Sequence, residues 1–178
     1  MISTFPRNLI LVFVSQKISK TVRIIAKAHY YLSSKSFLTL YYSPVNPCVT
    51  YCNVAWSSTY YSNLKCICLL QKRIVWLISK AHCVAYTTQL FSKLKVLDIY
   101  SINSFSVATF MNALAFHKLF LSSNQVHRYE ILLASQYRPH FCGTNIKQFS
   151  TLHRGPTIWN SLPVTLISSS SIFVFKNI

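Results

Sequence analysis

Residues 62–79, SNLKCICLLQKRIVWLIS, carry the most regular helical pattern of the sequence. Mostly apolar side chains return every three or four residues over about four turns, while lysines fall on the other side. Ser62 is a candidate N-cap, because its hydroxyl can accept a hydrogen bond from the first turn. The segment therefore predicts an amphipathic helix packed against a core. Its inward stripe consists of Leu64, Ile67, Cys68, Gln71, Ile74, Val75 and Ile78.

The segment before this helix predicts further helices. Between residues 16 and 32 the apolar side chains again follow a helical face, and Ser33 or Ser34 would cap a second helix. Pro44 and Pro47 then predict a break near residues 43–47, because proline lacks a backbone donor and clashes with the preceding turn. The inward face of the first helix consists of Ile18, Val22, Ile25, His29 and Leu32, and another face carries Lys20, Arg23 and Lys27.

Two more helices are expected after residue 80. One spans residues 86–92 and a longer one spans residues 96–116, with a bend at residues 93–95. The longer helix is predicted to turn Leu97, Ile99, Ile102, Phe105 and Phe110 inward.

The helical period is lost after residue 120. Asn124 and Arg138-Pro139 break helices, and the sequence predicts short strands around Phe141, 146–152 and 157–159. Gly143 and Gly155-Pro156 are expected to form turns. Trp159, within GPTIWNSLP (155–163), is predicted to be a packing anchor. The run LILVFV (9–14) is short for a signal peptide and is interpreted as a buried strand or a ragged start.

The charge of the chain points to a polyanionic partner. Eighteen lysines and arginines face only two acids, Asp98 and Glu130, which gives a net charge of +16. Nucleic acid is the first expectation and an anionic membrane surface the second. No run approaches the roughly 18 apolar residues of a membrane-spanning helix, so no span is expected.

The sequence shows no group of residues with the spacing of a known catalytic site. Two-metal or glycosidase chemistry needs carboxylates close together, and the two acids lie in different segments. The six cysteines are expected to be buried free thiols in a reducing compartment, the nucleus or cytoplasm. Cys48-x3-Cys52 and Cys66-x-Cys68 lack the spacing of a zinc site, so no metal is predicted.

Several blocks, taken in order, resemble the region that follows the catalytic palm in reverse transcriptases of jockey-like, LINE-type non-LTR retrotransposons. The similarity covers nearly the whole chain. It departs from the family where Glu130, Ile131 and Leu132 follow His127-Arg128-Tyr129, since the family tends to read H-x-Y-(N/D)-T-R. The blocks are QKISKTVRIIAKAHYYLS (16–33), LTLYYSPVNPCVTYCNVAWSSTY (38–60), NLKCICLLQKRIVWLIS (63–79), LFSKLKVLDIYSINSF (90–105), SNQVHRYEILLASQYRPHFCGTN (123–145) and GPTIWNSLP (155–163).

The resemblance implies a non-catalytic piece of an RNA-directed DNA polymerase. In that family a helical thumb cradles the template and primer, while the catalytic aspartates and their magnesium lie in the upstream palm. No catalytic residue or cofactor is therefore expected in this chain.

The expected fold is mainly α, a thumb-like helical bundle followed by a small irregular segment with short β-strands. Residues 1–13 would be a ragged start and 14–120 the thumb-like region. Residues 121–163 would form the small segment, and 164–178 a serine-rich linker with a truncated helix.

The expected partner is an RNA/DNA duplex, bound without sequence specificity. Two alternatives remain open: a decayed transposon copy without selected function, and a binding module co-opted by the host. A third is a polymerase whose palm is encoded upstream. The candidate phosphate contacts are Lys20, Lys27, Lys72, Arg73, Arg128, Lys147 and Arg154.

Overall fold

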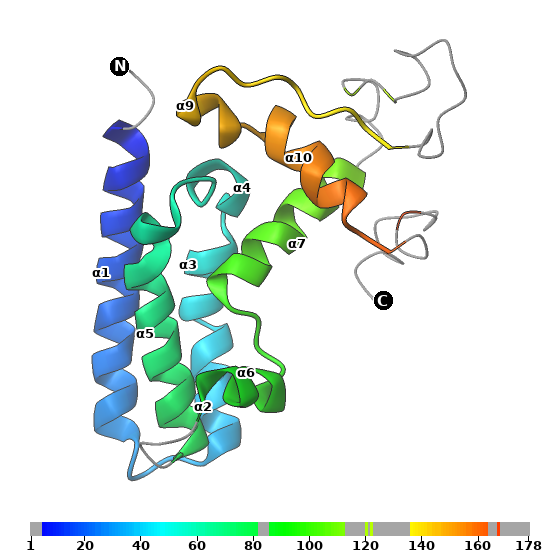
Figure 1. The fold of residues 1–178 in the computed structure, drawn as a ribbon. Helices are drawn as coiled ribbons and strands as arrows, with labels where there is room; N and C mark the ends of the chain where they lie inside the picture. Colours follow the sequence, from blue (N-terminus) through cyan, green and yellow to red (C-terminus); the bar gives the residue numbers. More distant parts are fainter. Residues whose placement is uncertain are drawn as a thin grey trace. The chain divides into compact units, whose positions relative to one another are not determined.

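The computed structural model of the chain describes residues 5–81, 86–112, 120, 122, 136–163 and 167. This part is mainly helical (Figure 1), which confirms the fold class expected from the sequence. Two compact units divide the chain, Met1–Asn103 and Ser104–Ile178. The division falls earlier than the boundary at residue 120 expected from the sequence.

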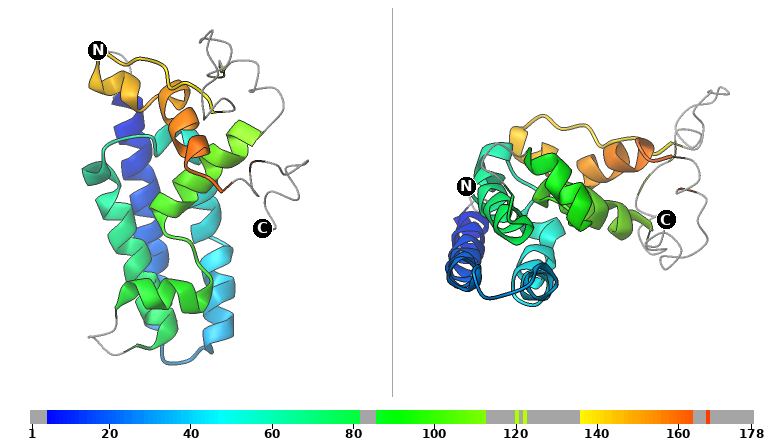
Figure 2. Two further views of the ribbon diagram at one scale, coloured as in Figure 1. Left: turned by 45° about the vertical axis from the view of Figure 1, so that its right-hand side comes forward. Right: turned by 90° about the horizontal axis from the view of Figure 1, so that it is seen from below.

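The first unit is built on two long helices that pack against each other, α1 (Phe5–Ala28) and α5 (Tyr61–Ser79). Figure 2 shows them side by side in both views. All seven predicted inward residues of α5 are buried, as expected. The predicted N-cap at Ser62 is wrong, because the cap position is Tyr60 and the helix begins one residue later.

The expected strand and ragged start near the N-terminus are also wrong, because α1 already begins at Phe5. Leu11 and Val14 are buried, and they continue the stripe of Ile18, Val22 and Ile25 at helical spacing. Residues 9–14 therefore extend the amphipathic helix instead of pairing in a sheet.

Three short helices connect α1 with α5. They are α2 (Ser34–Tyr42), α3 (Val45–Thr50) and α4 (Asn53–Trp56). Ser33 caps α2 by accepting a hydrogen bond from the Ser36 N–H at 3.3 Å, as the sequence predicted. The break expected around the prolines is confirmed, because α2 ends at Tyr42 and Pro47 falls in the first turn of α3, where no backbone donor is needed.

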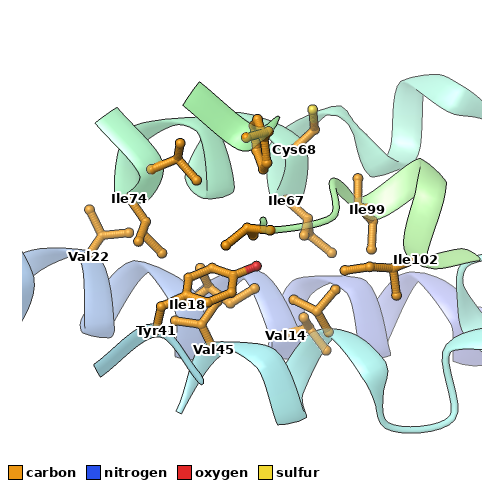
Figure 3. Packing of buried hydrophobic residues seen from close by; sticks show 14 of the residues in the cluster. Val14, Ile18, Val22, Tyr41, Val45, Ile67, Cys68, Ile74, Ile99 and Ile102 are labelled. Atoms are coloured by element: carbon orange, nitrogen blue, oxygen red, sulfur yellow. The ribbon is translucent and has the colours of Figure 1, made fainter. Parts of the chain in front are cut away.

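The core of this unit lies between α1, α5 and the connecting helices. Figure 3 shows side chains of α1, including Ile18 and Val22, directed toward Ile67 and Ile74 of α5. Tyr41 lies inside this layer with its hydroxyl accepting a hydrogen bond from the Gln71 amide at 3.0 Å. The Oε1 atom of Gln71 has no hydrogen-bond partner within the described residues.

The unit ends with α6 (Thr87–Leu94) and the first turn of α7 (Ile99–Asn112). The expected short helix is confirmed, whereas the longer one starts three residues late. Leu97 lies in the connection and is 51% exposed, and Phe105 is exposed as well, so both were wrongly predicted to turn inward. Asp98 accounts for the error at Leu97, because its Oδ1 accepts the Ser101 N–H at 3.0 Å and thereby fixes where the helix begins.

A buried polar cluster joins α4 to α7. Asn53, Ser57 and Asn103 are all buried. The Ser57 hydroxyl donates to Asn53 Oδ1 at 2.8 Å, and the Asn103 amide donates to both partners. Because these side chains satisfy one another, the cluster is a structural link and not a reactive site.

The second unit replaces the expected strands with helices. α9 (Asn145–Gln148) and α10 (Thr151–Asn160) occupy the segments predicted to be extended. The only strand-like pairing in the described part is an isolated bridge between Ser122 and Tyr137. The expected strand at Phe141 is likewise absent there. Ser150 caps α10 by accepting the Leu152 N–H at 3.3 Å, a local signal that favours a helix over a strand.

The expected turn at Gly155-Pro156 is wrong because both residues lie inside α10. The absence of a Cβ on Gly155 removes one of the clashes that proline makes in a helix, whereas Pro156 still supplies no N–H donor to the Leu152 carbonyl. Gly155 also permits close approach of α7, because a Cβ at this position would lie 2.6 Å from Met111 Sδ. The turn at Gly143 is confirmed as a bend.

The cysteines of the described part are free thiols, as expected, but their burial differs from the prediction. Cys68 is buried, whereas Cys52 and Cys66 are exposed. Within the described residues, every helix is too short or too polar to cross a membrane.

Candidate nucleic-acid interface

The candidate cations of α1 lie on the side of the helix turned away from the core. Lys20 and Lys27 are exposed, and so is Arg23 between them. Residues seven apart return to the same side after two turns, about 10 Å along the axis. The pattern of α1 therefore produces a row of three cations, which we call the α1 basic row (Lys20, Arg23 and Lys27).

The candidate cations of α5 are also exposed but do not share one line. Lys72 and Arg73 are consecutive, so their side chains diverge by about 100° around the helix. Arg73 is turned away from the buried stripe of α5, whereas Lys72 lies at the edge of that stripe beside Cys68. Since α1 and α5 pack through their buried stripes, the structure does not merge the two sets of cations into one patch.

The remaining candidates belong to the second unit. Lys147 is exposed on α9, and Arg154 is half-buried on α10, where burial lowers the pKa of its guanidinium. Arg128 lies outside the described residues. Of these three, Lys147 is the candidate shown to be open to solvent.

A cavity in the first unit adds residues that the sequence did not single out. It has a volume of about 610 Å³ and lies between α5, α6 and the first turn of α7. Lys72 and Lys95 line it, together with Asp98. Hydroxyl-bearing side chains complete the polar part of the lining, and these are Tyr61, Tyr100, Thr88, Ser92 and Ser101.

The backbone around Lys95 is fixed by the end of α6. Lys95 adopts the left-handed conformation with φ 53°, and its N–H bonds to the Ser92 carbonyl at 3.2 Å. The Val96 N–H bonds to the Phe91 carbonyl at 3.1 Å, which completes a Schellman cap. The Tyr42 hydroxyl donates to the Lys95 carbonyl at 3.3 Å. These bonds hold the Lys95 backbone at the cavity.

Two tyrosines stack at the cavity. The rings of Tyr61 and Tyr100 are nearly parallel, at 8°, with centroids 4.4 Å apart. Tyr61 comes from α5 and is 68% exposed, whereas Tyr100 comes from α7 and is half-buried. The pair therefore presents an aromatic surface to solvent beside the two lysines.

The titratable groups of the cavity favour binding over covalent chemistry. Burial raises the pKa of the Cys68 thiol, which nearby Lys72 opposes and Asp98 reinforces. Burial likewise raises the pKa of the Tyr100 hydroxyl. A thiol with a raised pKa stays protonated at neutral pH and does not supply the thiolate that a nucleophile requires. No group of three or more His, Cys, Asp or Glu positioned for a metal occurs in the described residues.

Part of this cavity had a signal in the sequence. Tyr61, Cys68 and Lys72 are spaced by seven and four residues, which places them on one side of a helix. The other wall contains Lys95 and Asp98, in the connection between α6 and α7. Sequence periodicity gives no information on where such a connection folds back.

Comparison of the chain with protein-family models, curated proteins and solved structures gives no match.

Proposed function

We propose that the chain binds nucleic acid through its exposed cations without reading sequence. The observation that carries the proposal is the excess of eighteen cationic side chains over two carboxylates. Two carboxylates cannot neutralise that charge within the fold. The polyphosphate backbone of a nucleic acid supplies the missing anions.

The α1 basic row supports this function geometrically. Its three cations lie on one side of a helix whose opposite side is buried, so all three can face a single ligand. Their spacing along the helix axis is about 4.5 and 6 Å, so the three cations extend over several successive phosphates of a nucleic acid strand. Lys72 and Arg73 offer further contacts on α5.

The resemblance of the sequence blocks leads us to propose a more specific role. The chain would be the non-catalytic region that follows the palm in a retrotransposon RNA-directed DNA polymerase. Its ligand there would be the RNA/DNA hybrid of template and primer, and no cofactor would bind within this chain.

Titration of a fluorescently labelled RNA/DNA hybrid with the full chain tests the proposal. The affinity should fall linearly with salt on logarithmic axes, with a slope of about −0.9 for each phosphate contact. If the α1 basic row alone makes contact, the slope would be about −3. Absence of binding, or binding with a flat salt dependence, would sink the proposal.

A further inference from the structure

We propose that the cavity between α5, α6 and α7 holds one unpaired nucleotide of a bound strand. Its base would stack on Tyr61, and its phosphate would be bound by Lys72 and Lys95. This inference rests on the proposed function, because it assigns a single-stranded part of the same ligand to a defined place.

The size of the cavity suits a mononucleotide. Its volume of about 610 Å³ falls within the roughly 300 to 1,000 Å³ typical of small-molecule sites. The lining contains an aromatic pair and two lysines at different places. A single strand can direct its base toward the first and its phosphate toward the second.

The aromatic pair offers a surface for a base. One face of the Tyr61 ring is covered by Tyr100, at a centroid distance of 4.4 Å. The large exposure of Tyr61 leaves area on this ring for a second flat group. Every base has such a flat face, so stacking would add affinity without demanding a particular sequence.

The charges of the cavity favour an anion over a neutral ring. Lys72 and Lys95 contribute two positive charges, and Asp98 contributes one negative charge. The Asp98 carboxylate already accepts the Ser101 N–H at the start of α7. The protonated Cys68 thiol adds no negative charge. The net charge of these groups is therefore positive.

Two oligonucleotides of equal length and charge test the inference, one of thymidines and one abasic throughout. The full chain should bind the thymidine strand about tenfold more tightly, since stacking is sensitive to the loss of the base. Tyr61→Ala should remove this advantage. Tyr31→Ala is the matched control, because Tyr31 is exposed in the turn after α1 and lies outside the cavity.

A second pair of variants tests the contribution of the cavity lysines to binding. Lys95→Gln should weaken binding of both strands, whereas Lys35→Gln, an exposed position on α2 outside the cavity, should have a smaller effect. Circular dichroism of each variant checks that the helices are retained.

The outcomes separate this inference from the proposed function. Equal binding of the two strands by the unmodified chain overturns the cavity assignment and leaves the binding function intact. Retention of the thymidine advantage in Tyr61→Ala overturns the assignment as well, whatever the effect of Tyr31→Ala. Failure to bind either single strand overturns the cavity assignment, while the titration of the RNA/DNA hybrid decides separately whether the binding function holds.

Discussion

At the scale of single residues, the stretch GPTIWNSLP has a structural role. Trp159 is 4% exposed, and its ring lies 6.5 Å from that of Tyr137. The Asn160 amide donates to the Tyr137 carbonyl at 2.8 Å, and its Oδ1 accepts the Tyr137 N–H at 3.1 Å. These two neighbours therefore attach α10 to the segment around Tyr137 by packing and by hydrogen bonding.

Trp159→Ala should destabilise the chain strongly. Removal of a buried aromatic side chain leaves a cavity and typically costs about 3 to 5 kcal/mol. Leu152→Ala, on an exposed position of the same helix, should change stability by only about 0.5 kcal/mol. Urea unfolding followed by circular dichroism measures both variants. Equal stability of Trp159→Ala and the unmodified chain would contradict the anchor role.

Tyr41 makes the first unit sensitive to high pH. Burial raises the pKa of its hydroxyl to about 12, and the hydrogen bond from Gln71 opposes this shift only in part. In the unfolded chain the tyrosine pKa is about 10. The folded state therefore holds the proton more tightly, so this contribution to stability is complete below pH 10 and is lost as the pH rises toward 12.

Tyr41→Phe isolates this effect. The unmodified chain should lose about 2 kcal/mol more than the variant between about pH 9 and 12, because most of the difference of two pKa units is expressed by the folded pKa. Urea unfolding at several pH values supplies the comparison, in which the other titrating groups are common to both proteins. Parallel pH profiles for the two proteins would show that Tyr41 titrates normally.

At the scale of elements, helix ends in this chain use lysine where glycine is usual. Lys80, at the end of α5, adopts φ 46° and its N–H bonds to the Leu77 carbonyl at 3.3 Å. A side chain in this left-handed conformation costs roughly 1 to 2 kcal/mol. Glycine adopts it without that penalty and commonly ends helices in this way.

Lys80→Gly should therefore stabilise the chain by about 1 kcal/mol, after the greater entropy of unfolded glycine is taken into account. Lys65→Gly is a matched control with the opposite sign, because Lys65 is exposed inside α5 and glycine there costs about 1 kcal/mol. Thermal melts of both variants test the pair. A lower melting temperature for Lys80→Gly would contradict the strain assigned to this position.

The elements also differ in how well the sequence predicted them. The buried positions of α5 were all predicted correctly, because burial of one face of a helix imposes a regular spacing on its apolar residues. α10 was missed because Gly155-Pro156 usually breaks helices, whereas here the helix continues through the pair and Gly155 packs against Met111. Leu97 was misplaced because a capping contact of Asp98, which depends on local geometry, decides where α7 starts.

At the scale of the whole molecule, composition predicted an excess of positive charge but not where on the fold the cations lie. The α1 basic row follows from helical spacing alone and has the exposure expected of it. Arg154 is half-buried, which no pattern around it indicated. The cavity depends on residues from three elements, so only its α5 wall had a signal in the sequence.

The most direct test of the central claim is the salt dependence of RNA/DNA hybrid binding by the full chain and by Lys20→Gln/Lys27→Gln. Both lysines are exposed, so the double variant should fold normally. Loss of two phosphate contacts should make the logarithmic slope shallower by about 2. An unchanged slope in a folded double variant would show that the α1 basic row does not bind the nucleic acid.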